Sequence, residues 1–299
     1  MKNFIVRAIT GILFVAIVVT CFLDPTAMVA LFALVTGMTI WEFTGLVNDR
    51  EGVKINRFIS TAAGVYFFLA VAGFCSGITP SAVFIPYLLT VVYLFISELY
   101  LRNEDAINDW AYTMMSQMYI ALPFSCINVL AFREASGSMA SSEAVSFPIL
   151  YGMLLPLSIY VFLWINDTGA YLSGSLLGRH KLFPRISPGK SWEGSIGGGI
   201  LVIAVSQLLA MIDHSGILET YGLATTQTGL TSLQWAGLGI VVVFFGTWGD
   251  LVESLLKRTL GVKDSGTILP GHGGMLDRFD SSLMAIPASV IYIYTISMC

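Results

Sequence analysis

Residues 237–280 read GLGIVVVFFGTWGDLVESLLKRTLGVKDSGTILPGHGGMLDRFD, an apolar helix that runs directly into a charged segment. Only 11% of the residues in the chain are charged, yet acidic and basic side chains crowd together between positions 250 and 280. Charged groups at the edge of hydrocarbon are costly unless they are paired, hydrated or bound to ions, so this segment is a candidate functional site. Carboxylates beside Lys, Arg and a PGHGG loop indicate chemistry on a metal ion and phosphate groups.

The rest of the chain is strongly apolar. Of its 299 residues, 56% are hydrophobic, and the mean hydropathy is +0.78. A soluble domain would carry roughly twice as much charge, and apolar runs of about 20 residues, each long enough to cross a bilayer, recur along the sequence. The sequence therefore predicts an all-α, polytopic integral membrane protein. The net charge of −4 says little about partners, and we expect no nucleic-acid binding.

We predict about nine transmembrane helices, and we interpret the first, which resembles a signal sequence, as an uncleaved helix. They lie near residues 8–23, 26–46, 58–76, 81–101, 110–132, 147–166, 194–212, 233–256 and 282–298. With this assignment, every Lys and Arg except Arg133 falls on one side of the membrane. Loops rich in Lys and Arg stay in the cytoplasm, so we expect a cytoplasmic N-terminus and an external C-terminus.

The chain divides into two predicted regions. Residues 1–140 hold the first five spans and would provide packing and dimer contacts, whereas residues 141–299 form the catalytic region. Most of the polar chemistry lies in the two longest predicted cytoplasmic loops, residues 167–193 and 257–281. The run Gly197–Gly199 would permit close helix packing, an interpretation that we prefer to a flexible helix start.

The second loop is flanked by two acidic pairs. Asp250 and Glu253 are three residues apart near the end of a helix, so their side chains share one face, and Asp277 and Asp280 repeat this spacing. Oxygen ligands of this kind suit a hard cation such as Mg²⁺, which proteins usually hold with one or two carboxylates and substrate phosphates. The alternative is structural ion pairing at the helix ends, between these neighbours: Glu253 with Lys257, and Asp277 with Arg278.

The glycine-rich turn Pro270–Gly274 reads PGHGG. Its glycines allow backbone N–H groups to approach an anion without interference from side chains. His272 would donate a hydrogen bond to a phosphate oxygen, although a hydrated loop histidine is the simpler alternative. Neither GxxxxGK[ST] nor GxGxxG occurs, which excludes the common nucleotide-binding folds in their usual form.

The first loop offers further phosphate ligands. Ser187 and Lys190 lie in the stretch SPGKSWEG, and Asp167 follows the sixth predicted span. A basic run precedes this stretch. We interpret His180 and Lys181 within it as anchors beside anionic lipid headgroups.

The segment Ser254–Asp280 resembles the signature of the bacterial phosphatidate cytidylyltransferases (CDP-diacylglycerol synthases). It contains S-L-L-K-R, then K-D-S-G, and then L-P-G-H-G-G-M-L-D-R-F-D. Residues 167–194, with DTGAY, a GR pair and SPGKSWEG, are similar to the other polar stretch of that family. The length and the hydropathy of the chain also fit bacterial members.

The resemblance implies transfer of the cytidylyl group of CTP to phosphatidic acid, which yields CDP-diacylglycerol and pyrophosphate and requires Mg²⁺. It also implies a second cation such as K⁺, a homodimer, and a site that faces the cytoplasm from the inner (cytoplasmic) membrane. The chemistry of the residues agrees, because a lipid phosphate is already anionic and needs little help from a general base. Metal ions with Lys and Arg would supply electrostatic help to the reacting phosphates.

The residues that carry these expected roles form three overlapping groups. Catalytic roles are expected for Asp250, Lys257, Lys263, Asp277, Arg278 and Asp280. The expected substrate ligands are Ser187, Lys190, Arg258, His272, Gly273 and Gly274. The expected metal ligands are Asp250, Glu253, Asp277 and Asp280. In addition, Asp264 would orient Lys263, and Asp167 would approach the site from the sixth span.

Two other activities stay open at this point. A CTP-dependent lipid-alcohol kinase would share the multi-span body and the CTP site, but it would release CDP instead of pyrophosphate. An ion-coupled transporter also places carboxylates within the membrane, usually near the midplane at broken helices. A CDP-alcohol phosphotransferase would need an acidic motif of the DGxxAR kind, which the sequence lacks.

Two further acids, Glu42 and Glu98, lie at the predicted cytoplasmic ends of their spans. We interpret them as interfacial anchors, or as ion-pair partners of Arg50 and Arg102. The chain also has four cysteines and no CxxC motif, so we expect neither a disulfide nor a zinc site. These cysteines are Cys21, Cys75, Cys126 and Cys299.

Overall fold

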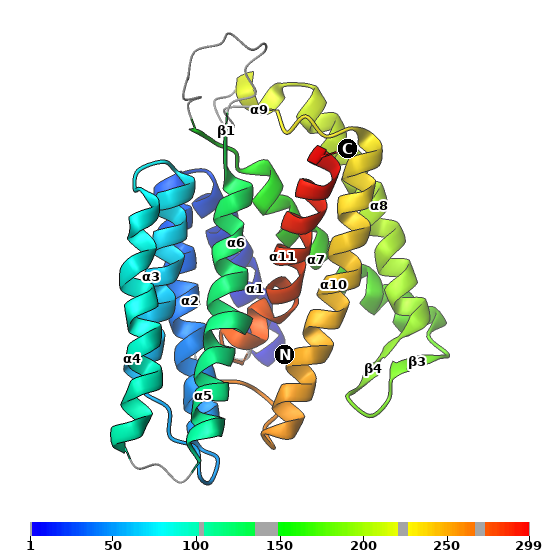
Figure 1. Cartoon of the computed structure of the whole chain (residues 1–299). Coiled ribbons are helices and arrows are strands. Elements are labelled where there is room, and N and C mark those ends of the chain that lie inside the picture. Colours follow the sequence, from blue (N-terminus) through cyan, green and yellow to red (C-terminus); the bar gives the residue numbers. More distant parts are fainter. Residues whose placement is uncertain (1, 102–104, 135–148, 221–226, 267–272, 299) are drawn as a thin grey trace, which may run out of the picture.

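The computed structural model describes residues 2–101, 105–134, 149–220, 227–266 and 273–298, with the side chains of all but residues 2–8, 101 and 134. The chain forms a bundle of long helices with two short β-hairpins (Figure 1). The helices are α1 (Lys2–Phe22), α2 (Pro25–Asn48), α3 (Arg57–Cys75), η1 (Ser81–Phe84), α4 (Ile85–Leu101), α5 (Ala106–Met115), η2 (Ser116–Ala121), α6 (Leu122–Ala131), α7 (Leu154–Leu177), α8 (Trp192–His214), α9 (Ile217–Thr220), α10 (Ser232–Thr259) and α11 (Leu276–Met298). The strands are β1 (Phe132–Glu134), β2 (Ile149–Tyr151), β3 (Lys181–Phe183) and β4 (Ser187–Ser191).

Within the described ranges, seven helical segments are long and apolar enough to cross a membrane. They coincide with the second to fifth and the seventh to ninth predicted spans. The first and sixth predicted spans correspond to α1, which contributes the shorter apolar helix Ile9–Phe22, and to α7, whose centre carries the polar residues Asn166 and Asp167. The fold class is confirmed as a helical membrane protein. The count of nine spans and the sidedness of the termini stay predictions, as does the division near residue 140, which lies outside the described residues.

The ends of several helices follow from local sequence. The Asp24 side chain accepts a hydrogen bond from the Ala27 N–H, and Pro25 occupies the first position of α2, where no backbone donor is needed. Thr231 begins α10 with a capping box, in which the Thr231 and Gln234 side chains each bond the other residue's backbone N–H. Ser191 ends β4 and caps α8 by accepting from the Gly194 N–H.

Two predicted boundaries near the polar loops are wrong. The predicted sixth span ends at residue 166, but α7 continues as a helix to Leu177. The predicted ninth span begins at residue 282, but α11 begins at Leu276. Hydropathy marks only the apolar part of a helix, whereas a helix continues through polar residues while its backbone hydrogen bonds are maintained. Asp167, Asp277 and Asp280 therefore lie on helices, which hold them in fixed directions.

An aromatic cluster fixes the start of α11. The buried Phe279 ring has its centroid 5.6 Å from that of Phe14, 5.7 Å from that of Phe124 and 5.9 Å from that of Tyr160. The ring of Phe32 also packs against that of Phe279, and the two centroids are 6.2 Å apart. Edge-to-face aromatic contacts of this kind are stabilising beyond the area that they bury. Because Phe279 is held within the bundle, the acidic residues on either side of it point elsewhere.

Glycines bring the polar helices close together. A Cβ placed on Gly169 of α7 would lie 2.9 Å from the Cα of Gly198 in α8, so only glycine allows these backbones to approach. The same holds for Gly249 of α10, where a Cβ would lie 2.9 Å from the Asp280 carbonyl oxygen. Small residues of this kind drive close packing in membranes. The interpretation that the Gly197–Gly199 run permits close helix packing is supported at Gly198.

The two hairpins modify the all-α prediction locally. β1 pairs with β2 in antiparallel register, with Arg133 opposite Leu150. β3 pairs with β4, with Lys181 opposite Ser191. Figure 1 shows the β3–β4 hairpin at the start of α8, beside the lower half of α10. This hairpin carries the SPGKS stretch and brings it to the polar helix ends.

Candidate active site

A cavity of about 380 Å³ lies where the polar ends of three helices meet α1. One wall is apolar and consists mainly of α1 residues with Trp164 of α7. The polar part of the lining comes from α7, α10 and α11. The apolar wall contains Gly11, Phe14, Val15 and Trp164, beside Thr10, and the polar wall contains Asp167, Asp250, Asp277, Arg278, Asp280 and Ser281. The first cavity is thus lined by both charged and apolar residues.

Three carboxylates of the polar wall, which we name the cavity acids, come from three helices: Asp167 from α7, Asp250 from α10 and Asp280 from α11. Asp280 interacts electrostatically with both of the others, and Asp167 interacts with Asp250 and with the guanidinium of Arg278. The predicted convergence of Asp250 and Asp280 from neighbouring helix ends is confirmed. The expected approach of Asp167 from the sixth span is confirmed as well.

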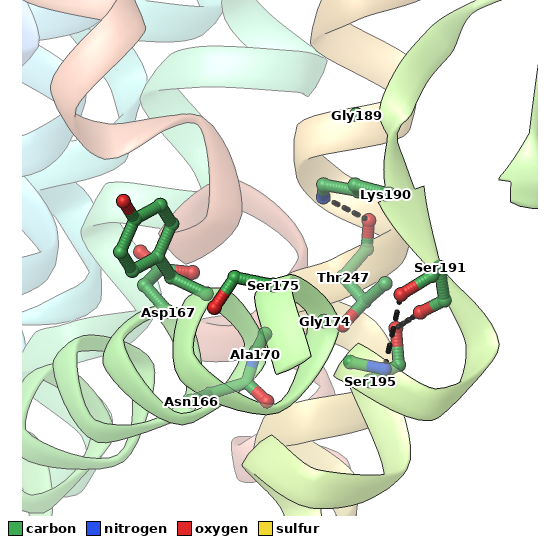
Figure 2. A pocket seen from close by; sticks show the side chains of 12 residues that line it. Asn166, Asp167, Ala170, Gly174, Ser175, Gly189, Lys190, Ser191, Ser195 and Thr247 are labelled. Atoms are coloured by element: carbon green, nitrogen blue, oxygen red, sulfur yellow. Dashed lines mark hydrogen bonds between the residues drawn. The ribbon is translucent and has the colours of Figure 1, made fainter. Parts of the chain in front are cut away.

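Lys190 joins the first polar stretch to the second. Its ammonium lies 2.5 Å from Asp250 Oδ2 and 3.4 Å from the backbone carbonyl oxygen of Thr247, both in α10. Lys190 also lines a second cavity of about 370 Å³, shown in Figure 2, between α7, β4 and the start of α8. Asp167 lines both cavities, so the two lie side by side.

A different set of carboxylates, which we name the loop acids, consists of Glu42 and Asp277. Asp277 Oδ1 lies 2.6 Å from the ammonium of Lys257. Its Oδ2 accepts hydrogen bonds from the N–H of Ser265 at 2.8 Å, from the Ser265 hydroxyl at 3.0 Å and from the N–H of Gly274 at 2.8 Å. Although Asp277 lines the first cavity, both of its oxygens are occupied by the protein.

Lys257 is shared between two acids. Its ammonium lies 2.7 Å from Glu253 Oε2, and the Glu253 side chain has no exposed surface. Neither oxygen of Glu253 accepts a hydrogen bond of ordinary geometry from the described residues, so the ion pair with Lys257 neutralises it. The alternative of structural ion pairing therefore holds for Glu253 and Lys257. Among the described ion pairs, the partner of Asp277 is Lys257 and not Arg278.

The conformation of the glycines at the end of the PGHGG turn is set by these acids. Gly273 has a φ of 80°, and a Cβ at this position would lie 2.5 Å from Asp277 Oδ2. A Cβ on Gly274 would lie 2.5 Å from Glu42 Oε2. Both glycines thus pack on carboxylates of the protein. The Gly274 N–H, which we expected to meet a phosphate, donates to Asp277.

Glu42 is the residue whose position sequence reasoning missed. The interpretation as an interfacial anchor or a partner of Arg50 is wrong, because Glu42 is buried, with 6% exposure, and accepts N–H groups of Met275 and Leu276. The only signal in the sequence is a carboxylate inside the apolar helix α2. Glu98 is also buried, with 7% exposure, and its expected partner Arg102 lies outside the described residues.

The remaining expected residues, as far as the structure describes them, do not line the first cavity. Arg258, Lys263 and Asp264 are exposed, and Lys263 and Asp264 form no ion pair with each other among the described residues. Ser187 is half-buried at the start of β4. His180 Nδ1 lies 2.6 Å from Glu193 Oε1, and the His180 side chain is exposed. His272 lies outside the described residues.

The donor chemistry of the first cavity fits a hard cation, because the described residues that line it offer carboxylate and hydroxyl oxygens and neither sulfur nor imidazole. The acids do not form a ready-made cluster, since no three His, Cys, Asp or Glu side chains in the described ranges are grouped closely enough to hold a metal ion. Asp250 is instead neutralised by Lys190. Asp250 also accepts a hydrogen bond from the Ser254 hydroxyl, whereas Asp280 accepts, among the hydrogen bonds of the described residues, one from the N–H of Ser281.

Sequence comparison decides the family. The family model described as "Cytidylyltransferase family" matches residues 5–296, which is nearly the whole chain. This chain belongs to the cytidylyltransferase family. All the cavity acids and loop acids, with Lys190 and Lys257, lie inside the matched region.

Several proteins named phosphatidate cytidylyltransferase are 32% to 38% identical to this chain over the aligned residues. A protein of Haemophilus influenzae named phosphatidate cytidylyltransferase is 32% identical over 270 residues, covering 86% of this chain and 87% of the relative. A protein of Staphylococcus epidermidis with the same name is 36% identical, covering 68% of this chain and 77% of the relative. A Staphylococcus aureus protein with that name is 38% identical, and the match spans 62% of this chain and 60% of the relative.

Proposed function

We propose that this protein transfers the cytidylyl group of CTP to phosphatidic acid and forms CDP-diacylglycerol and pyrophosphate. The observation that carries the proposal is the first cavity, which is lined both by carboxylates with Arg278 and by apolar residues of α1. A phosphorylated lipid needs both surfaces at once, one for its phosphate and one for its chains. The names of the family relatives, phosphatidate cytidylyltransferase, support the same substrates.

The reaction is a substitution at phosphorus. An oxygen of the lipid phosphate forms a bond to the α-phosphorus of CTP, and the bond from that phosphorus to the oxygen bridging to the β-phosphate breaks. The electron pair of the broken bond leaves with pyrophosphate, and no proton has to be removed from the attacking phosphate dianion. The main obstacle is repulsion between two anionic phosphates, which positioned positive charge and alignment overcome.

The basic residues around the cavities supply part of this charge. Lys190 lies between the two cavities and would contact the triphosphate, with Ser187 and Ser191 of the same hairpin nearby. Arg278 lines the first cavity and would contact the lipid phosphate or the leaving pyrophosphate. Arg258 and Lys263 are exposed beside the α10–α11 connection and would attract CTP from solution.

The cavity acids have the opposite charge from the basic residues and need a cation to bind phosphates beside them. We propose that Asp167, Asp250 and Asp280 hold Mg²⁺, which when bound supplies positive charge against the triphosphate. Glu253, buried beside Lys257, would stabilise the arrangement of the metal ligands without binding the metal itself. We also propose a second cation such as K⁺. The loop acid Asp277 would hold the α10–α11 connection instead of the metal.

The proposal also includes location and assembly. We propose that the protein lies in the bacterial inner membrane with both cavities facing the cytoplasm, where CTP is available. The distribution of Lys and Arg among the loops supports this orientation. The family resemblance further implies a homodimer, which chemical cross-linking in native membranes would test.

The test uses purified full-length protein with phosphatidic acid, diacylglycerol as a lipid alcohol, Mg²⁺, and CTP that carries a radiolabel at either the α- or the γ-phosphate. Cytidylyl transfer moves the α-label into the lipid fraction and releases the γ-label as pyrophosphate. A CTP-dependent lipid-alcohol kinase would instead move the γ-label into a lipid alcohol and release CDP. Label in neither product, with the protein folded and Mg²⁺ present, would rule out both enzymes and leave transport as the alternative.

A further inference from the structure

Glu42 connects the first half of the chain to the α10–α11 connection. It belongs to α2, and it lies 233 positions before Met275 in the sequence. Its Oε1 accepts the N–H of Met275 at 2.8 Å, and its Oε2 accepts the N–H of Leu276 at 3.0 Å. The first N–H groups of a helix have no partner within the helix and carry partial positive charge. A buried carboxylate from another helix therefore caps α11.

The same carboxylate lies against the other side of the connection. The Ser265 hydroxyl lies 3.3 Å from Glu42 Oε2. A Cβ placed on Gly266 would lie 2.8 Å from Glu42 Oε1 and 3.3 Å from the Cα of Gly274. Gly266 and Gly274 are thus in direct contact, and Glu42 packs on both. One side chain of α2 holds together the two described ends of the α10–α11 connection.

The loop acid Asp277 completes this network from within the connection. Ser265 lies between the two carboxylates, since its oxygen is also 3.0 Å from Asp277 Oδ2. Asp277 in turn binds Lys257 of α10. Glu42, Ser265, Asp277 and Lys257 therefore form a continuous chain of contacts from α2 to α10.

The first turn of α11 carries residues that line the first cavity. Arg278 and Asp280 lie two and four positions after Leu276, which Glu42 holds. A small change in the direction of this turn would move both side chains relative to the reacting phosphates. Misplacement of reacting groups by about 1 Å can cost about 100-fold in rate.

We propose that Glu42 is a positioning residue for the transfer reaction: it fixes the first turn of α11 and so the geometry of Arg278 and Asp280, without touching substrate. The kinetic part of this proposal rests on the proposed function. Glu42 itself does not line either cavity. Replacing Glu42 should therefore change the kinetics differently from replacing a residue that binds the cation or a substrate phosphate.

The key variant is Glu42→Gln, because glutamine keeps the shape but places an amide N–H₂ against backbone N–H groups that need an acceptor. Glu98→Gln is the matched control, since Glu98 is buried to a similar degree, 7% exposed against 6%, on α4 and lines neither cavity. Both variants are studied as the full chain in detergent. Measured quantities are kcat, the KM for CTP, the thermal midpoint, and hydrogen–deuterium exchange of peptides that cover residues 275–280.

We expect Glu42→Gln to lower kcat by about 10- to 100-fold, with a change of less than about threefold in the KM for CTP. Amide exchange in the first turn of α11 becomes faster, while exchange in α2, α3 and α8 stays as in the wild type. Glu98→Gln leaves kcat and the exchange of α11 unchanged. A residue that only stabilised the bundle would alter the thermal midpoint and exchange generally, without this local pattern.

Three results would overturn the proposal: wild-type kcat in Glu42→Gln, unchanged exchange at residues 275–280, or a rise in KM without a loss of kcat. If Glu42→Gln does not fold, Glu42→Asp decides, because it keeps the charge but is one methylene shorter. Folded Glu42→Asp with reduced kcat and locally faster exchange supports the proposal, and full activity overturns it. If the wild type transfers no cytidylyl group, the proposed function fails, and the exchange measurement still tests whether Glu42 holds α11.

Discussion

The cavity acids and the loop acids are the same kind of side chain in two different environments. Asp277, a loop acid, accepts three hydrogen bonds at one oxygen and binds an ammonium at the other. Asp280, one helical turn later, accepts a short bond from the N–H of Ser281 and faces the cavity beside Asp167 and Asp250. The number of donors that the protein supplies separates a carboxylate that holds a loop from one that can bind a cation with its substrate.

The largest expected effect comes from removing the charge of a cavity acid. Asp280→Asn should lower the rate of cytidylyl transfer by about 100-fold or more, because the polar wall loses a carboxylate where cation and phosphates would meet. Asparagine has nearly the same shape, and Asp280 has few protein donors to lose. The thermal midpoint should stay close to that of the wild type. Near-normal transfer rates in this variant would show that the reaction does not need the charge of Asp280.

The second effect concerns Lys190, whose ammonium pairs with Asp250 of the first cavity and lines the second. Lys190→Met should raise the KM for CTP by about tenfold, which corresponds to about 1.4 kcal/mol of lost binding. The cause is loss of the ammonium that lies beside Asp250 and lines the second cavity. Steady-state kinetics with varied CTP measure this directly. Lys181→Met, an exposed change in the same hairpin, serves as the control and should leave the KM unchanged.

The third effect tests the loop acids through stability. Asp277→Asn removes the charge that holds Lys257 and two backbone N–H groups, and hydrogen bonds to a charged group contribute about 1.5–3 kcal/mol each. We expect the thermal midpoint in detergent to fall by about 5 °C, together with a loss of activity. The contrast with Asp280→Asn is the informative result. Equal thermal midpoints for the two variants would mean that the two sets of acids do not differ as described.

The smallest effect is expected at the exposed end of the hairpin. His180→Ala removes an exposed ion pair with Glu193, and pairs of this kind contribute little. Glu193 still accepts the backbone N–H groups of Arg179 and His180, so the hairpin keeps its attachment to α8. Transfer rates should stay within about twofold of the wild type. A large loss would place His180 in the site, contrary to its position on the exposed face.

The convergence of the cavity acids was predictable because it depends on local rules. Alternation of spans brings neighbouring helix ends to the same side of the membrane, so Asp250 and Asp280 were expected to meet. Three-residue spacing alone was misleading, because Asp277 and Asp280 have different surroundings. The basic stretch around Lys190 was likewise expected near Asp250, and the structure joins them. The fold class followed from hydropathy, which reports directly on the membrane.

What sequence reasoning missed depends on contacts between distant segments. Nothing near Glu42 in the sequence indicates that its partners are Met275 and Leu276, because that contact exists only after α2 packs beside the start of α11. The glycines of the PGHGG turn are a similar case, since their need for space comes from Glu42 and Asp277. Helix boundaries at α7 and α11 were also missed, because hydropathy falls before the helix ends.

The most direct test of the account is the label experiment applied to the wild type and to Asp280→Asn in parallel. With phosphatidic acid and Mg²⁺, the wild type should move the α-label of CTP into lipid and release the γ-label as pyrophosphate, while folded Asp280→Asn should do neither at a comparable rate. Transfer of the γ-label to lipid by the wild type, or equal α-label transfer by both proteins, would contradict the account.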